Sequence, residues 1–213
     1  SYAVPVNRSS SLLAGVAASV AVAIVFDRPM PDLAQLGGAI LLILASVVLA
    51  FGPRVSRPGE RLVLFVCSGN NCRSAMAERL AMLEASRRLG ESVEQMRARG
   101  LVFASAGVSA KVGEAMERPA VDALARAGAD ISSHRSQMVT PELIARAEVV
   151  ICLSPEYRDR VIELAPWARA RTHLLDPEGR AVDKPADGDF DRFARELLVM
   201  IRDRFDRLAI VTG

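Results

Sequence analysis

Apolar and polar positions divide the chain into two parts with different patterns. Residues 1–57 are dominated by two long uncharged runs, Leu12–Phe26 and Leu33–Phe51. From residue 58 onward, short apolar runs of strand length alternate with stretches of helix length. Since these patterns are typical of different kinds of structure, we predict an N-terminal segment at 1–57 and a second domain at 58–213.

The second domain alternates predicted strands and helices. Strands are predicted at the short apolar runs Leu62–Val66, Leu101–Ala106 and Val149–Leu153, with a last strand at Arg171–Leu175. Helices are predicted at Ser74–Leu89, Pro119–Ala127, Pro155–Leu164 and Asp189–Leu208, with another starting after Thr140. This alternation predicts an α/β fold with a four-stranded parallel sheet and helices on both faces. Ligands of such sheets bind at the carboxyl ends of strands, where Cys67 falls.

The N-terminal segment has the pattern of a transmembrane helical hairpin. Leu33–Phe51 is an uncharged run of 19 residues, and a membrane span needs ~20 apolar residues, with ~17 still sufficient. The first run reaches that length when Ser9–Ser11 is included. The turn Asp27–Asp32 between the runs contains two prolines, which cannot continue a helix. We therefore predict an all-α hairpin with spans at about residues 10–26 and 33–52.

Arginines flank the two predicted spans on one side. Arg8 precedes the first span and Arg54, Arg57 and Arg61 follow the second, whereas the turn carries one arginine and two aspartates. The positive-inside rule then places both ends in the cytoplasm. This predicts a two-span protein of a bacterial-type inner membrane, with the lipid bilayer as partner and the second domain on the cytoplasmic side. A signal peptide cleaved after Ala23 is the alternative for the first run.

The residues from Cys67 to Ser74 carry the candidate chemistry. Cys67 follows a predicted strand, and Arg73 comes after five intervening residues, at the start of a predicted helix. Free N–H groups and the helix dipole at such a position favour an anion. The same field stabilises a cysteine thiolate, which is a nucleophile, and Arg73 adds a planar fork of donors for an oxyanion. The loop therefore predicts attack by sulfur on phosphorus or a similar tetrahedral oxyanion.

Composition narrows the class of partner. The formal net charge is +2, so nothing indicates a nucleic-acid partner. The chain has three cysteines, two of them in one loop, and this is no disulfide framework; it favours a reducing compartment. The third, Cys152, lies in a buried-strand pattern and is interpreted as a small core residue.

Cys67, Arg73 and Ser74, with Gly69, Asn70 and Cys72 between them, resemble the phosphate-binding loop of the low-molecular-weight protein tyrosine phosphatases. The resemblance spans roughly residues 60–208 and continues through the segments 103–107, 127–136, 147–151 and 174–179. It implies the family's fold and the hydrolysis of phosphotyrosine-type phosphomonoesters through a cysteinyl-phosphate intermediate. It also implies that no metal or cofactor takes part, and that the substrate is a phosphoprotein or a small phosphoester.

The resemblance further implies a role for each loop residue. Cys67 is the expected nucleophile, Arg73 binds the oxyanion and the transition state, and Ser74 helps hold Cys67 as a thiolate. The phosphate is expected on backbone N–H groups of Ser68, Gly69, Asn70, Asn71, Cys72 and Arg73.

Residues around the loop are expected to support it. In the family Asn70 braces the loop and is held by a serine and a histidine, which here correspond to Ser105 and His134. Cys72 is a candidate to trap an oxidised Cys67 as a reversible disulfide. Simple loop packing remains the alternative for both Asn70 and Cys72.

The general acid is where the chain departs from the family. The family supplies it from an Asp-Pro pair before the last helix, but here Lys184 precedes Pro185, and a lysine is a poor proton donor at neutral pH. Asp183 is the nearest candidate, although a shift of one residue in an extended loop is expected to turn its side chain away. Asp176 and Asp187 are further candidates. Since losing acid help costs ~10²–10⁴-fold in rate, we predict a slow phosphatase.

Three functions stay open from the sequence. One is a membrane-anchored phosphatase. Another is a catalytically inactive accessory subunit whose hairpin docks into an integral membrane partner, such as a transport, respiratory or photosynthetic complex. The third is arsenate reduction, which relatives with this loop perform by passing electrons through two further cysteines. Only Cys152 follows the central helices here, which disfavours that relay.

Overall fold

A computed structural model describes residues 59–211, which belong to the unit Val55–Gly213. The predicted spans at about 10–26 and 33–52 lie outside the described residues. Within residues 59–211 no helix combines the length and the apolar character that a membrane crossing requires.

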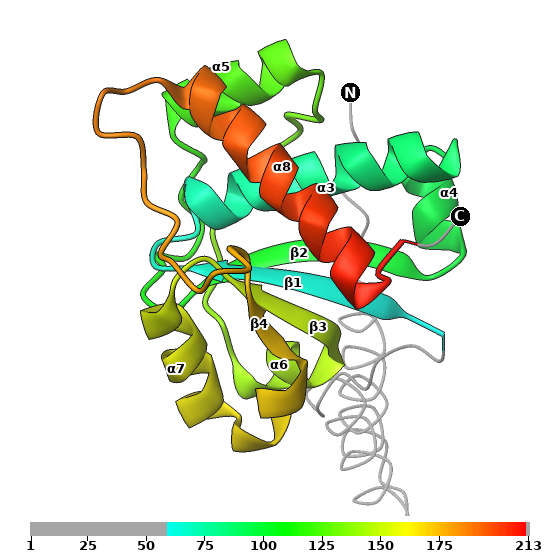
Figure 1. Cartoon of the computed structure of the whole chain (residues 1–213), viewed down its shortest axis with the longest axis vertical. Helices are drawn as coiled ribbons and strands as arrows, with labels where there is room; N and C mark the ends of the chain where they lie inside the picture. Colours follow the sequence, from blue (N-terminus) through cyan, green and yellow to red (C-terminus); the bar gives the residue numbers. More distant parts are fainter. Residues whose placement is uncertain (1–58, 212–213) are drawn as a thin grey trace, which may run out of the picture. The chain divides into compact units, whose positions relative to one another are not determined.

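A four-stranded parallel sheet forms the centre of the domain (Figure 1). Its spatial order is β2 (Leu101–Gly107), β1 (Arg61–Cys67), β3 (Ala147–Cys152) and β4 (Thr172–Leu174). All three strand pairs are parallel. The residues from Leu62 to Val66 in β1 are at most 2% exposed, because helices cover both faces of this central strand. The predicted α/β fold with four parallel strands is therefore confirmed.

Helices cover each face of the sheet (Figure 1). One face carries α3 (Arg73–Leu89), α4 (Val93–Ala98), α5 (Arg118–Ala127) and α8 (Phe190–Leu208). The other carries α6 (Pro141–Arg146), α7 (Pro155–Leu164) and the short 3-10 helix η1 (Pro166–Arg171). Buried residues recur along α8 at helical spacing, and one of them, Phe205, stacks on Phe103 of β2 with ring centroids 6.0 Å apart. This contact holds α8 against the sheet.

Local sequence explains most helix ends. Thr140 caps α6 by accepting a hydrogen bond from the Leu143 N–H at 3.2 Å, and Asp189 caps α8 by accepting one from Arg192 at 2.8 Å. Gly90 ends α3 with a left-handed conformation. The predicted first and last residues of α3, α5, α7 and α8 agree with the structure to within about one residue. The short helix α4 is an addition, which sequence patterns did not predict.

The carboxyl ends of the strands meet at one edge of the sheet. Cys67 at the end of β1 pairs in register with Gly107 at the end of β2. On its other side, Val66 pairs with Cys152, the last residue of β3. Loops that follow the strands therefore converge on Cys67.

Candidate active site

The cysteine loop, residues Cys67–Arg73, links the end of β1 to the start of α3. The segment after β2 holds its first residues: Val108 donates to the Cys67 carbonyl and Ser109 donates to the Ser68 carbonyl, each at 3.0 Å. Gly107 makes this approach possible, because a Cβ atom at that position would lie 2.1 Å from the Ser68 carbonyl oxygen. A side chain at residue 107 is incompatible with this loop.

Asn70 is the centre of the hydrogen bonds that support the loop. It is fully buried and has a left-handed backbone with φ of 56°. Its Oδ1 accepts from the Gln137 N–H at 2.9 Å, and its Nδ2 donates to Ser105 Oγ at 2.8 Å and to Ser74 Oγ at 3.0 Å. Its carbonyl oxygen lies 2.6 Å from His134 Nε2. The structure thus brings Asn70, Ser105 and His134 together.

The direction of the hydrogen bond between Ser74 and Cys67 follows from these contacts. Since Ser74 Oγ accepts a hydrogen bond from Asn70 Nδ2, its own proton is free to point elsewhere. Cys67 Sγ lies 2.9 Å from that oxygen, closer than the Ala106 carbonyl at 3.4 Å. The Asn70 N–H also points at the sulfur, at 3.4 Å. Cys67 therefore occupies the position of an acceptor, as a nucleophilic thiolate does.

Two further residues complete the support, and sequence reasoning missed both. Glu78 accepts a hydrogen bond from Ser105 Oγ at 2.5 Å, and the Gln137 side chain donates to the Ser105 carbonyl at 2.9 Å. Glu78 follows Ser74 by one helical turn of α3, so its place facing the loop was open to detection. Gln137 lies in the irregular segment between α5 and α6, whose sequence carries no comparable signal.

Arg73 is held on several sides. Its Nη2 donates to the Tyr157 hydroxyl at 2.9 Å, and its guanidinium carbon lies 5.3 Å from the centroid of that ring. On the other side, Nη1 lies 3.5 Å from the Val182 carbonyl oxygen and 3.8 Å from Asp183 Oδ1. The guanidinium therefore lies between α7 and the loop that precedes α8.

Asp183 and Lys184 lie on different sides of the 176–189 loop. Lys184 Nζ donates to Glu117 Oε1 at 2.5 Å, whereas Asp183 lies beside Arg73 with 81% of its side chain exposed. We expected Asp183 to face away from the cysteine loop, and the structure differs. Side chains alternate as assumed, but Val182 is buried and its N–H donates to the Leu153 carbonyl at 2.7 Å. This anchor fixes which of the two side chains faces Arg73.

The two other candidate aspartates are occupied elsewhere. Asp176 is buried, which would raise its pKa, but hydrogen bonds from Arg180 and from the Glu178 N–H outweigh burial and lower the pKa of its carboxyl. Asp187 accepts from the Asp189 N–H and pairs with Arg192, and these contacts lower its pKa as well. Both carboxylates accept a backbone hydrogen bond within a turn and pair with an arginine, and these contacts favour the ionised form over a proton donor.

The remaining thiols differ from Cys67 in their surroundings. Burial, with a smaller contribution from Glu117, raises the pKa of Cys72 to about 12. Burial likewise raises the pKa of Cys152. Both side chains therefore stay protonated near neutral pH, and a protonated Cys72 is a slow partner for an oxidised Cys67. In the part of the chain that the structure describes, no cluster of His, Cys, Asp and Glu has the composition to hold a metal ion.

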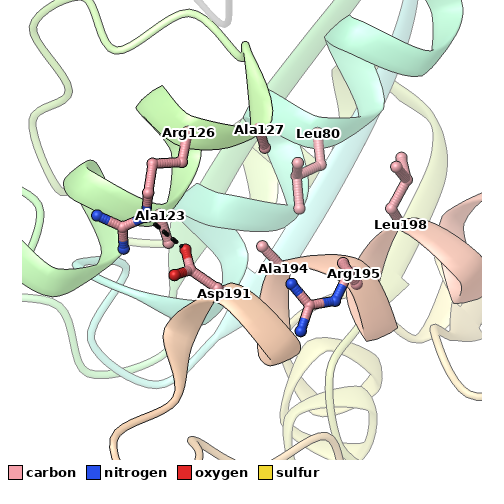
Figure 2. A pocket seen from close by; sticks show the side chains of 8 residues that line it. All are labelled: Leu80, Ala123, Arg126, Ala127, Asp191, Ala194, Arg195 and Leu198. Atoms are coloured by element: carbon pink, nitrogen blue, oxygen red, sulfur yellow. Dashed lines mark hydrogen bonds and ion pairs between the residues drawn. The ribbon is translucent and has the colours of Figure 1, made fainter.

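A hollow of about 360 Å³ lies away from the cysteine loop, between α3, α5 and α8 (Figure 2). Leu80, Ala123 and Ala194 line it, and Arg126 pairs with Asp191 across its rim at 2.8 Å. Arg195 also lines the hollow, but no nucleophile does, so the hollow adds nothing to the chemistry of Cys67.

The fold and the site define the class of this protein: it is an α/β protein with a cysteine loop at the carboxyl end of a central strand. The protein family described as "Low molecular weight phosphotyrosine protein phosphatase" matches this chain over residues 62–210, which is well over half of the chain. The chain therefore belongs to the low molecular weight phosphotyrosine protein phosphatase family.

Individual relatives agree with this assignment. The low molecular weight protein-tyrosine-phosphatase Ptp of Acinetobacter johnsonii is 29% identical over 128 residues, which cover 60% of this chain and 81% of that protein. A protein-arginine-phosphatase of Geobacillus stearothermophilus is 32% identical over 113 residues, covering 53% of this chain and 68% of its own. The crystal structure of the tyrosine phosphatase from T. tengcongensis superposes with a TM-score of 0.60 at 26% identity, covering 70% of this chain and 99% of that one.

Proposed function

We propose that this protein is a membrane-anchored phosphatase that hydrolyses phosphotyrosine-type phosphomonoesters through a cysteinyl-phosphate intermediate. The observation that carries the proposal is the pair of donors on Cys67 Sγ, from Ser74 Oγ at 2.9 Å and from the Asn70 N–H at 3.4 Å. Donors in these positions favour a nucleophilic sulfur. The substrate is a phosphoprotein or a small phosphoester.

The first step transfers the phosphoryl group to sulfur. The Cys67 thiolate forms the S–P bond while the bond from phosphorus to the leaving oxygen breaks. Arg73 and the backbone N–H groups of the loop hold the phosphoryl oxygens as charge spreads over them. In the complex with substrate the phosphoryl oxygens replace the Asp183 carboxylate at Arg73, and Asp183 in its protonated form gives its proton to the leaving oxygen.

The second step releases phosphate. A water molecule attacks phosphorus and gives a proton to the Asp183 carboxylate, while the S–P bond breaks and the Cys67 thiolate re-forms. Asp183 is largely exposed, and within residues 59–211 its carboxylate contacts Arg73 in a 3.8 Å ion pair but accepts no hydrogen bond. Because this part of the chain does not fix its carboxyl group more tightly, we expect a slow enzyme.

The membrane part of the proposal rests on the N-terminal sequence. The uncharged 19-residue run Leu33–Phe51 has the length of a span, and the arginines on its far side favour a cytoplasmic phosphatase domain. The location is then a bacterial-type inner membrane, with the bilayer as partner and an integral membrane protein as a further partner through the hairpin.

A non-enzymatic subunit is the second candidate, and one observation favours it. Lys184 stands where the family places its acid, and it is engaged with Glu117. A phosphatase domain without an effective acid would suit a structural role in a membrane complex. Arsenate reduction is supported less, because Cys152, the one later cysteine, is fully buried.

The test is turnover of p-nitrophenyl phosphate by the full chain in mild detergent, beside Cys67→Ser and Cys152→Ala. A good leaving group needs little acid help, so the loop itself is measured. We expect turnover that Cys67→Ser abolishes and that Cys152→Ala, the matched control for a buried cysteine, retains. Phosphotyrosine and phosphoarginine peptides then compare the two substrate classes named among the relatives. A folded chain without turnover would overturn the enzyme proposal and favour the subunit.

A further inference from the structure

Tyr157 contacts the cysteine loop although it lies far from it in sequence. It occupies the first turn of α7, where its backbone N–H donates a hydrogen bond to Ser154 Oγ at 3.4 Å and fixes the start of the helix. Its side chain turns inward, and the residue is only 7% exposed. Among residues 59–211, Arg73 is the side chain whose guanidinium meets both the ring and the hydroxyl of Tyr157.

The contacts between Tyr157 and Arg73 restrain the guanidinium in two independent ways. The hydroxyl accepts a hydrogen bond from Nη2 at 2.9 Å, which fixes one edge of the group. The ring lies 5.3 Å from the guanidinium carbon, a cation–π contact that restrains it further. The Val182 carbonyl lies 3.5 Å from Nη1 at the other side. A long side chain is thereby left with little rotational freedom.

Restraint of this kind matters for catalysis by an arginine. The guanidinium presents its donors in a rigid fork, so its orientation decides how many of them meet the phosphoryl oxygens. Donors that are already oriented cost no reorganisation when charge develops in the transition state. An unrestrained arginine would have to lose rotamer freedom at that moment.

We infer that Tyr157 is a positioning residue that orients the Arg73 guanidinium toward the phosphoryl group in the transition state. The inference rests on the proposed function for its turnover readout only. Binding of vanadate, which adopts the geometry of the transition state, and of inorganic phosphate provides a readout that needs no turnover.

Two substitutions separate the two contacts, and a third serves as a control. Tyr157→Phe keeps the ring and removes the hydroxyl, whereas Tyr157→Leu removes both. Trp167→Leu removes a similar contact, since the Arg171 guanidinium lies 5.1 Å from the Trp167 ring centroid. Trp167 lies in η1, which leads into the amino end of β4, whereas the cysteine loop follows the carboxyl end of β1 in the same parallel sheet.

The variants are measured as the full chain, by kcat and KM for p-nitrophenyl phosphate, vanadate and phosphate affinity, and thermal melting. A hydrogen bond to a charged group predicts a loss in kcat/KM of about tenfold or more for Tyr157→Phe. We expect that loss in kcat rather than KM, with vanadate affinity falling by a similar factor and phosphate affinity falling less. Tyr157→Leu loses about threefold more, and Trp167→Leu matches the unaltered chain.

Several results would overturn the inference. Unchanged kcat/KM and vanadate affinity in Tyr157→Phe would show that the hydroxyl does not orient Arg73. An increase in either would mean that Tyr157 holds Arg73 away from the anion. If the unaltered chain turns over no substrate but binds vanadate, the proposed function fails while the vanadate comparison still decides the role of Tyr157. A folded chain that binds no vanadate overturns both.

Discussion

Lys184 and Glu117 form an ion pair across the cysteine loop, with Nζ 2.5 Å from Oε1. Glu117 precedes α5, and its N–H donates to the Asn71 carbonyl inside the loop at 2.8 Å. Glu117 therefore connects the 176–189 loop to the cysteine loop, by its side chain on one side and its N–H on the other. Lys184 lies where the family places its general acid, but its ion pair with Glu117 holds the loop in place beside Asp183. We call this ion pair the tether.

Asp183→Asn tests the acid. We expect kcat/KM to fall by about 10²-fold for alkyl or unactivated aryl phosphates, because these leaving groups need a proton. For p-nitrophenyl phosphate the loss should be only a few-fold. The measurement is the dependence of kcat/KM on leaving group, and Asp187→Asn, which affects an ion pair with Arg192, is the control. A loss that is equal for all leaving groups would contradict the acid role.

Lys184→Met and Glu117→Gln test the tether. Each is expected to lower kcat/KM by up to about fivefold, because partly exposed ion pairs contribute only ~0.2–1 kcal/mol. The double variant should lose no more than either single one, since both remove the same interaction. Lys184→Asp should also lose activity, because it places a second carboxylate beside Glu117. Additive losses, or a gain with Lys184→Asp, would contradict the tether.

Asn70→Ala and Asn70→Gly separate the side chain of Asn70 from its backbone. Both variants lose the hydrogen bonds to Ser74, Ser105 and Gln137, so both should lose at least about tenfold in kcat/KM. Asn70→Ala should melt lower than Asn70→Gly, because alanine at a φ of 56° is strained by about 1 kcal/mol. Equal melting temperatures for the two would mean that the loop relaxes when the side chain is lost.

Thiol labelling tests the contrast between the cysteines. Because burial raises the pKa of Cys72 to about 12, Cys72 should stay a thiol and resist iodoacetate at neutral and mildly alkaline pH. Cys67 should be labelled, and vanadate should protect it. Peptide mapping by mass spectrometry identifies the modified residue. Labelling of Cys72 at a rate matching Cys67 would show that its burial is incomplete in solution.

Glu84 links pH to stability at the contact of α3 with α8. Its carboxylate is buried, which opposes ionisation, but hydrogen bonds from Arg88 and Arg202 at 2.9 Å lower its pKa below the usual 4.5. A lowered pKa contributes stability above the unfolded pKa, and this is lost as the pH falls through the folded pKa. Glu84→Gln should therefore cost about 1–3 kcal/mol at neutral pH.

Urea unfolding of both proteins at a series of pH values measures this effect. The difference between them should shrink as the pH falls below about 4.5, because the carboxylate of the unaltered chain becomes protonated. Glu148→Gln is a matched control, since its pair with Arg61 is about half exposed on both sides. A difference that is independent of pH would contradict the ionised state of Glu84.

Much of the site was predictable because it lies on elements with strong local signals. The apolar run that forms β1 and the helix-favouring stretch after Arg73 place Cys67 at a helix N-terminus. The braces at Ser105 and His134 followed from the family resemblance rather than from any pattern in the residues. Ser105 lies on β2, whereas His134 lies in the irregular segment between α5 and α6, so only the family pattern located it.

The 176–189 loop was harder to predict because no regular element fixes its register. Whether Asp183 or Lys184 faces Arg73 depends on the buried Val182 and on Glu117, which lies 67 residues away from Lys184. Tyr157 was missed for a related reason. Its side chain reaches Arg73 from α7, the helix after β3, and the two residues are 84 positions apart in the sequence. Contacts between distant segments leave no periodicity in a sequence.

The two ends of β1 have different roles: the chain enters the domain at one end, and the reactive sulfur lies at the other. The chain enters β1 at Arg61 and reaches the nucleophile at Cys67, about 20 Å further along an extended strand. Every residue between them is buried in the sheet, so this stretch acts as a rigid spacer. Whatever precedes Gly59 can lengthen, shorten or be exchanged during evolution without moving Cys67 relative to Arg73. The same domain can therefore follow different N-terminal segments while the position of its reactive sulfur stays unchanged.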